Sequence, residues 1–368
     1  MEMTKKEFIR KYTSAIRKGN AAIFAGAGLS RASGFVDWKN LLRPLAERIN
    51  LDVDKESDLL AVAQYVRNEA YNRTSINQEI IEAFTESTYT NKNIDIISRL
   101  PIYTYWTTNY DVLIEEGLEK ANRRADVKER TSQLPHTLKD RDAIVYKMHG
   151  DYRTPADAVL TKDDYVLYDK NRPLFRTVLQ GNLISKTFLF VGFSFEDPNI
   201  SFILDQITGA MGENVPEHYC IFRKVQESDY SLSEEFEYDL GKQDLRIKDL
   251  ARRGIRTVFV DDYDEITDVL SEIESSIKRN NVFISGSADD YNGWSDDDLE
   301  KLVSGLAQKL IENNFKITSG FGKGIGSLIV NGALTEILYR LLVQVALQKE
   351  FWIKLRQILM ISNTWTHT

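Results

Sequence analysis

Cysteine is nearly absent from this sequence, which has Cys220 alone among its 368 residues. One thiol can form neither an intrachain disulfide nor a four-cysteine zinc site. A chain without disulfides fits a reducing compartment, so we expect a cytoplasmic protein that holds no metal. Histidine is also scarce, with four in the chain, and a histidine that follows a predicted strand is therefore weighed as a catalytic group.

The sequence also lacks a basic excess and long apolar runs. It has 47 lysines and arginines against 55 aspartates and glutamates, for a formal net charge of -8, whereas a duplex-binding protein carries a basic stripe. No run approaches the roughly 20 apolar residues that a membrane-spanning helix needs, and the N-terminal segment lacks the apolar core of a signal peptide. We therefore expect no nucleic-acid partner and no membrane association.

What the sequence does contain is an alternation of short apolar segments with helical patterns. Several apolar segments stop at a glycine or a polar turn, as in AAIFAGAG, DAIVYKMHGD, KTFLFVGFSFEDPN and IRTVFVDDYDEI. This alternation predicts an α/β open sheet with a ligand in the crevice at the carboxyl ends of its strands. A closing helix before residue 280 and a new apolar segment after it predict two domains, 1–279 and 280–368.

The segment AAIFAGAGLSRASGF, residues 21–35, has the form of a nucleotide-binding loop after a strand. Gly26 and Gly28 match the start of a dinucleotide fingerprint, but Arg31 stands where the third glycine belongs, so the dehydrogenase pattern fails. The glycines still allow the backbone to approach a pyrophosphate, with amides pointing outward and Ser30 able to hydrogen-bond it. An ordinary strand-to-helix turn is the alternative.

Three further segments place polar side chains after predicted strands. TTNYD carries Asn109 and Asp111, which could orient a ribose or water and hold a carboxamide, or simply cap a helix. KMHGD carries His149, a candidate general base whose alternative is a structural role. VGFSFEDPN carries Gly192 and Ser194 before a turn-and-cap signal, which is weak evidence when taken alone.

Taken in order, these segments read GAG-x-S, T-x-N-x-D, HG and G-x-S, and over roughly residues 10–275 they resemble the NAD-binding layout of sirtuins. The resemblance implies that Asn109 and His149 are catalytic, with His149 as the base. It implies an NAD site made of Ala25, Gly26, Ala27, Gly28, Ser30, Thr108, Asp111, Gly192 and Ser194. Thr108 stands where the family usually has glutamine.

One departure from the sirtuin pattern bears on the chemistry. Sirtuin deacylases carry a four-cysteine zinc module, which a chain with one cysteine cannot build. The resemblance therefore implies hydrolysis of NAD+ to ADP-ribose and nicotinamide, with water as the acceptor. A protein deacylase or ADP-ribosyltransferase, and a non-catalytic sensor of NAD or ADP-ribose, stay open as alternatives.

The C-terminal unit has two glycine-containing segments of its own. VFISGSADDYN and ITSGFGKGIGS resemble SLOG domains, which are Rossmann-like sensors of nucleotide-derived ligands. The resemblance implies a regulatory ligand site at Gly286, Ser287, Gly322 and Gly324. The Walker pattern fails because Lys323 is followed by glycine, and a glycine-rich loop without a ligand is the alternative.

A sirtuin-like domain followed by a SLOG domain resembles the effectors of the Thoeris anti-phage system. The resemblance implies activation by a cyclic ADP-ribose isomer from a TIR-domain partner, and a homo-oligomer, with a tetramer as one form. It fades near residue 338, so we expect an incomplete SLOG domain with an atypical tail from about 339. The last thirty residues have one acidic side chain, Glu350, and are interpreted either as an amphipathic capping helix or as a foreign tail.

Overall fold

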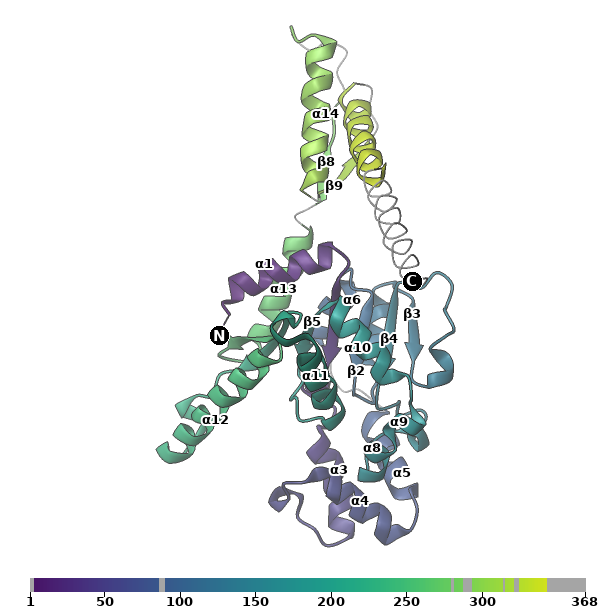
Figure 1. The fold of residues 1–368 in the computed structure, drawn as a ribbon, viewed down its shortest axis with the longest axis vertical. Helices are drawn as coiled ribbons and strands as arrows, with labels where there is room; N and C mark the ends of the chain where they lie inside the picture. Colours follow the sequence, from purple (N-terminus) through teal and green to yellow (C-terminus); the bar gives the residue numbers. More distant parts are fainter. Residues whose placement is uncertain are drawn as a thin grey trace, which may run out of the picture. The chain divides into compact units, whose positions relative to one another are not determined.

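The computed structural model describes residues 3–85, 90–278, 281–286, 293–313, 315–320 and 324–342 (Figure 1). The chain divides into two compact units, Met1–Glu274 and Ser275–Thr368, and helix α13 (Glu265–Lys278) runs across the division. The domain limits expected from the sequence, 1–279 and 280–368, stay a prediction. Each unit is described by itself.

The first unit is built on one sheet of seven parallel strands in the order β3-β4-β2-β1-β5-β6-β7. The strands are β1 (Ala21–Ala25), β2 (Thr104–Thr107), β3 (Ala125–Lys128), β4 (Ala143–Lys147), β5 (Thr187–Val191), β6 (His218–Arg223) and β7 (Ile255–Val260). The central strand β1 is buried throughout. Near-continuous apolar runs are typical of strands covered on both faces, so the predicted α/β class is confirmed.

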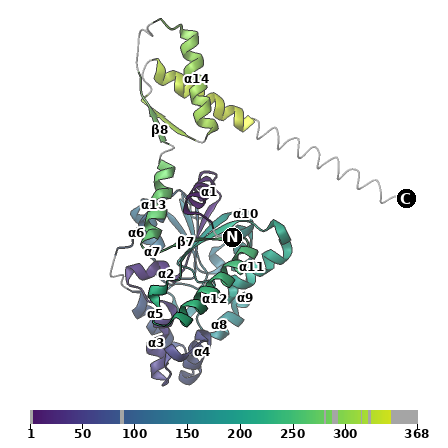
Figure 2. The same cartoon turned by 90° about the vertical axis from the view of Figure 1, so that its left-hand side faces the viewer.

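Helices cover both faces of this sheet, with α6, α7 and α13 on one side and α10 and α11 on the other (Figure 2). The remaining helices include a layer of α3, α4, α5 and α8 that lies beyond the carboxyl ends of the strands (Figure 1). The helices before α13 are α1 (Lys5–Arg17), α2 (Ala27–Ser30), α3 (Trp38–Arg48), α4 (Leu59–Ala70), α5 (Thr74–Phe84), α6 (Lys92–Arg99), α7 (Leu113–Lys120), α8 (Lys162–Val166), α9 (Tyr168–Asn171), α10 (Phe175–Ser185), α11 (Pro198–Met211) and α12 (Ser233–Arg252).

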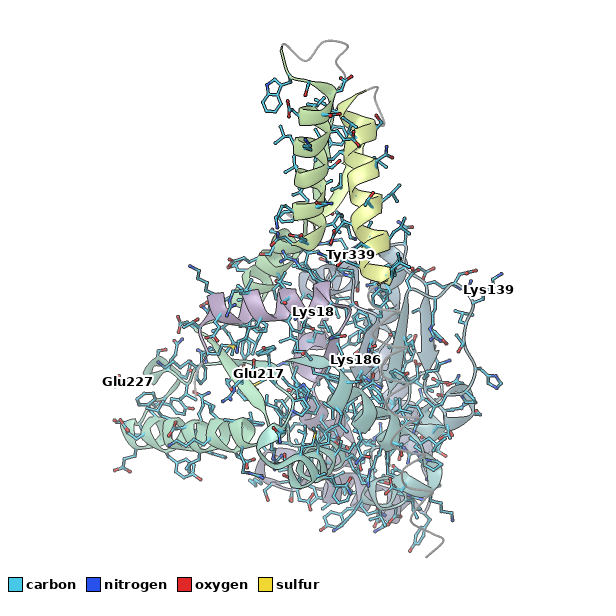
Figure 3. The ribbon with its side chains drawn as sticks, turned by 45° about the horizontal axis from the view of Figure 1, so that its top comes forward. Lys18, Lys139, Lys186, Glu217, Glu227 and Tyr339 are labelled. Carbon is cyan, nitrogen blue, oxygen red and sulfur yellow. The ribbon has the colours of Figure 1, made fainter. Side chains whose placement is uncertain are left out.

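Aromatic side chains fill the core between the sheet and helices α10 and α11. The rings of Phe24 and Phe190 stack with centroids 5.2 Å apart, and Phe193 lies 4.8 Å from Phe24. Large rings bury much apolar area and hold neighbouring strands in register. On the other face, Lys11 of α1 pairs with Glu217 at 3.0 Å, just before β6 (Figure 3).

The second unit contains a parallel pair, β8 (Asn281–Ile284) and β9 (Lys316–Ser319), with helix α14 (Asp296–Glu312) and the helix Ile325–Leu342. Its core is small and is made of Leu299, Val303, Ala307, Ile329 and Ala333. A strand, helix and strand in this order agree with the predicted Rossmann-like start. The tail expected to be atypical lies mostly at 343–368, outside the described residues.

By length and composition, the helix Ile325–Leu342 could cross a membrane, and 17% of that segment is buried. Tyr339, near its end, is 63% exposed (Figure 3). The expectation that no apolar run approaches a membrane span therefore has one exception among the described residues. Length and composition do not separate such a span from a helix of a soluble protein.

Candidate active site

The strand register brings the predicted site residues together. Ala25 of β1 lies opposite Thr107 of β2 and Val191 of β5, and Thr107 lies opposite Lys147 of β4. Because these strands are parallel, the residues that follow them meet at one edge of the sheet. The loops that begin at Gly26, at residue 108, at residue 148 and at residue 192 therefore lie together at this edge.

The glycines after β1 and β5 pack against each other. The amides of Gly26 and Gly28 donate to the carbonyl oxygens of Val191 and Gly192, both at 2.9 Å. A Cβ on Gly26 would lie 2.4 Å from the Gly192 oxygen. The expectation that these amides point outward toward a pyrophosphate is wrong for Gly26 and Gly28, since close packing of the two loops uses them.

Gly192 is the position where a side chain is least tolerated. Its φ is +63°, and a Cβ there would lie 2.1 Å from the Leu29 nitrogen. We expect Gly192→Ala to destabilise the protein by at least about 1–3 kcal/mol and to weaken NAD+ binding, as measured by urea unfolding and calorimetry. Gly209→Ala is the control, because Gly209 is an exposed position of α11 where an added Cβ would have no atom within 4 Å, and stability there should rise by about 0.5–1 kcal/mol. Equal effects at both positions would contradict the packing argument.

Hydrogen bonds hold the Asn109 side chain in place and leave its oxygen atom without a partner among the described residues. Its Nδ2 donates to the carbonyl oxygen of Gly26 at 3.0 Å and to Ser30 Oγ at 2.8 Å, and its backbone amide donates to Thr107 Oγ1 at 2.9 Å. An amide side chain has two donor hydrogens and one acceptor oxygen. The acceptor Oδ1 is therefore the group that can receive a hydrogen bond from a ribose hydroxyl or a water.

Asp111 completes this cluster from the next turn of chain. Ser30 Oγ donates to Asp111 Oδ2 at 2.7 Å, and the Leu113 amide donates to Oδ1 at 3.1 Å. Burial raises the pKa of Asp111 above its ordinary value, although the Ser30 hydrogen bond and Lys147 oppose that rise. Ser30 is only 3% exposed, so its hydroxyl serves Asn109 and Asp111, and the expected contact with pyrophosphate is not prepared in this arrangement.

His149 faces the carboxylate of Asp197, for which the sequence predicted only a turn and a helix cap. Its Nε2 lies 3.1 Å from Asp197 Oδ2, an ion-pair distance at which the hydrogen-bond alignment is not met. Tyr165 OH donates to the same oxygen at 3.0 Å, and the Tyr165 ring meets the imidazole edge-on at 5.4 Å. His149 is 5% exposed, so Asp197 and Tyr165 set the position of its ring.

Asp197 also caps helix α11, because its Oδ1 accepts from the Ile200 amide at 3.0 Å. Burial by itself would raise the pKa of Asp197, but the charge of His149 and the hydrogen bonds outweigh it and hold the pKa below its ordinary value. The DPN motif predicted this helix cap from the sequence. The sequence could not show that the capping carboxylate also faces His149.

A buried ionic cluster lies behind the turn that carries Asn109 and Asp111. Lys147 is fully buried and donates to Asp151 Oδ2 and to the carbonyl oxygen of Asp111, both at 2.6 Å. Glu115 lies 3.2 Å from the same nitrogen, outside hydrogen-bond alignment. Burial by itself would lower the pKa of Lys147, but Glu115 and Asp151 outweigh it and raise the pKa. This cluster ties the Asn109–Asp111 turn to β4.

The other predicted NAD-site residues differ in accessibility. Ala25 is buried, Ala27 and Thr108 are half-buried, and Gly28 and Ser194 are exposed. Ser194 and Thr108 make no side-chain hydrogen bond within the described part of the chain and are accessible to a ligand. No group of three or more histidine, cysteine, aspartate or glutamate side chains among the described residues could hold a metal.

Two of the four predicted regulatory residues lie in the described part of the second unit. A Cβ on Gly286, after β8, would lie 3.1 Å from Ile325 Cδ1, so this loop packs on the start of the helix Ile325–Leu342. Gly324 has a φ of +87° and its carbonyl oxygen accepts from Ser327 Oγ at 2.8 Å. Ser287 and Gly322 lie outside the described residues.

Comparisons with known proteins agree with this architecture. Residues 103–240 match the SIR2-like domain, and residues 265–345 match the Sir2- and TIR-associating SLOG family. NAD(+) hydrolase ThsA of Bacillus cereus is 48% identical over 331 residues, which cover 90% of this chain and 70% of that protein. NAD(+) hydrolase ThsA of Acinetobacter baumannii is 46% identical over 339 residues, 92% of this chain and 70% of that protein. Defense-associated sirtuin 2 of Bacillus subtilis is 26% identical over 208 residues, 55% of this chain and 20% of that protein.

A parallel sheet that matches the SIR2-like domain, followed by a segment that matches the SLOG family, defines a SIR2–SLOG protein. The chain belongs to the family of the NAD(+) hydrolases named ThsA. The family resemblance inferred from the four sequence segments is thereby confirmed.

Proposed function

We propose that this chain hydrolyses NAD+ at the bond between nicotinamide and ribose, with Asn109 and His149 as its catalytic residues. The proposal rests on one observation above all, the placement of the free Asn109 acceptor and of His149 after the adjacent strands β2 and β4. Membership in a family of NAD(+) hydrolases supports the same activity and makes NAD+ the substrate.

Cleavage of this bond needs no strong general acid. The nicotinamide ring is positively charged while it is bonded to the ribose and becomes neutral when it leaves, and the ribose develops oxocarbenium character, as in glycoside cleavage. Asn109 Oδ1 would orient a water or a ribose hydroxyl, and His149, positioned by Asp197, would take its proton. Asp111 would hold the carboxamide, and Ser194 and Thr108 would contact the ribose or phosphate.

Two other activities remain as outcomes of experiment. Transfer to a protein acceptor would require a peptide groove, and trapping a modified peptide or ADP-ribosylated product would support it. A non-catalytic sensor would bind NAD+ or ADP-ribose and release no nicotinamide. The relatives' names as NAD(+) hydrolases favour hydrolysis over both.

We further propose a defence role in the cytoplasm, switched on when a cyclic ADP-ribose isomer binds the SLOG segment. A relative named for defence supports the role. The match to the Sir2- and TIR-associating SLOG family supports the regulation. A TIR-domain protein would make the ligand, and the active form would be a homo-oligomer. Binding shifts the activity only if the ligand has a higher affinity for the active assembly.

Nicotinamide release with and without cyclic ADP-ribose isomers tests the regulation. We expect ligand to raise the rate at least about fivefold, within the usual range of allosteric coupling. Gly286→Trp, which would crowd Ile325, is expected to remove the response and leave basal release unchanged. Release that is equally fast without ligand would contradict the regulation and leave the hydrolase intact.

A further inference from the structure

A cavity of about 510 Å³ lies in the first unit, at the carboxyl ends of β3 and β4 and next to α8 and α9. Figure 1 labels these four elements. The walls of the cavity are formed by residues 130–132, 156–159 and parts of 164–172. The cavity shares no lining residue with the predicted NAD site. It borders the His149 loop, because the amide of Val159 in its wall donates to the His149 carbonyl oxygen at 2.9 Å.

The main feature of this cavity is the guanidinium of Arg172. Arg172 is 5% exposed, and within the described ranges no carboxylate oxygen lies within ion-pair distance of it. Its Nη2 donates to the Asp157 carbonyl oxygen at 2.7 Å, and its Nη1 donates to the Glu129 carbonyl oxygen. Burial lowers the pKa of Arg172, and the opposing effects of Tyr168, Asp157 and Glu129 do not outweigh it.

The carboxylates of the cavity wall are already paired with other cations. Asp157 pairs with Arg130 at 2.8 Å, and Asp164 pairs with Arg73 at 2.6 Å. Among the described residues, no carboxylate therefore forms an ion pair with Arg172, and Asp157 and Glu129 act on its charge only from beyond ion-pair distance. Burying a charge without a partner is costly, so an anion that entered the cavity would recover part of that cost.

The remaining hydrogen-bond donors suit an oxyanion. A guanidinium has five N–H groups, and the two carbonyl oxygens use two of those of Arg172. Thr131 Oγ1 is buried without a hydrogen-bond partner in the same wall, and Ser132 and Asn171 line the cavity beside it. Planar guanidinium groups with neighbouring hydroxyls are typical phosphate ligands.

We propose that this cavity is a second ligand site, which binds a small phosphate-bearing anion through Arg172, Thr131 and Ser132. The cavity is larger than one phosphate ion, so it has room for a phosphate monoester such as a nucleotide. The proposal goes beyond NAD+ hydrolysis and does not depend on it.

Equilibrium dialysis of the full chain with radiolabelled inorganic phosphate, at constant ionic strength, tests this site. We expect saturable binding to wild type, a loss of about tenfold or more in affinity for Arg172→Gln, and a smaller loss for Arg172→Lys. Because Arg172 also links two loops, Ala156→Trp provides a second test. Ala156 is an exposed cavity residue, and a large ring there would block the cavity without touching the guanidinium.

Competition with AMP separates the two sources of the phosphate group. Displacement by AMP at lower concentration than by unlabelled phosphate would indicate a nucleotide ligand, and weaker displacement would indicate free phosphate; both outcomes support the site. Absence of saturable binding to wild type would overturn the proposal. Binding that persists at wild-type affinity in both Arg172→Gln and Ala156→Trp would also overturn it, because the anion would then occupy another place.

Discussion

Replacing His149 with alanine is expected to lower the rate of nicotinamide release from NAD+ by about 10²–10⁴-fold, the usual contribution of a general base. His136→Ala is the matched control, since this histidine is exposed and the hydrogen bond from Lys128 uses its backbone carbonyl oxygen, not its imidazole. Far-UV circular dichroism and urea unfolding would show that both variants are folded. Full turnover by folded His149→Ala would remove the assigned base.

Asp197→Asn separates positioning of His149 from capping of α11. Asparagine caps helices as well as aspartate, so the start of α11 should be preserved. The negative charge that faces His149 is lost, and we expect turnover to fall by about tenfold or more with a changed pH–rate profile, because the base no longer has its partner. A capping role alone would leave both the rate and the pH profile as they are in wild type.

Lys147→Met is expected to destabilise the first unit by about 3–5 kcal/mol in urea unfolding, because it leaves the buried carboxylate of Glu115 without its cation and leaves Asp151 with Arg153 alone. Turnover should fall as well, because Lys147 holds the backbone of the turn that carries Asn109. Lys120→Met is the control at an exposed, ion-paired lysine, where a change within about 0.5 kcal/mol is expected.

The same cluster gives stability a predictable acid dependence. Burial by itself would raise the pKa of Asp151, but Arg153 and Lys147 outweigh it and hold the pKa below its ordinary value. A carboxylate with a lowered pKa in the fold stabilises it above about pH 4 and loses that contribution as the pH falls through the folded pKa. Lys147→Met should weaken this acid-induced loss, and an unchanged pH dependence would show that the pair contributes nothing.

Local signals were enough to predict where the site residues stand along the chain. An apolar run followed by a polar turn marks the end of a buried strand, and the residues after β1, β2, β4 and β5 were predicted in this way. In a parallel sheet such ends meet at one edge, so Asn109 and His149 could be expected to share a crevice. Which of their atoms are free for a ligand could not be predicted.

The glycines show the limit of that reasoning. Gly26 and Gly28 were interpreted as a pyrophosphate cradle, because glycine allows close backbone approach to any group. In the fold the group that approaches is the loop after β5, with a Cβ on Gly28 only 3.0 Å from Gly192 Cα. A sequence pattern indicates that the backbone comes close to something and does not identify what.

The sequence by itself determined strands β1, β2, β4, β5 and β7, the order of the motifs and the family, because apolar runs, turn residues and motif spacing are local properties of the chain. Strands β3 and β6 were not predicted from the sequence. The tertiary structure decided which side chains contact each other. Ser30 meets Asp111 across 81 residues, and Asp197 reaches His149 from a different loop. Such contacts depend on strand order and register, which bring distant residues within hydrogen-bond distance only once the sheet has formed. The lack of an ion pair at Arg172 among the described residues belongs to the same class, since it is visible only when the neighbours of the guanidinium are in place.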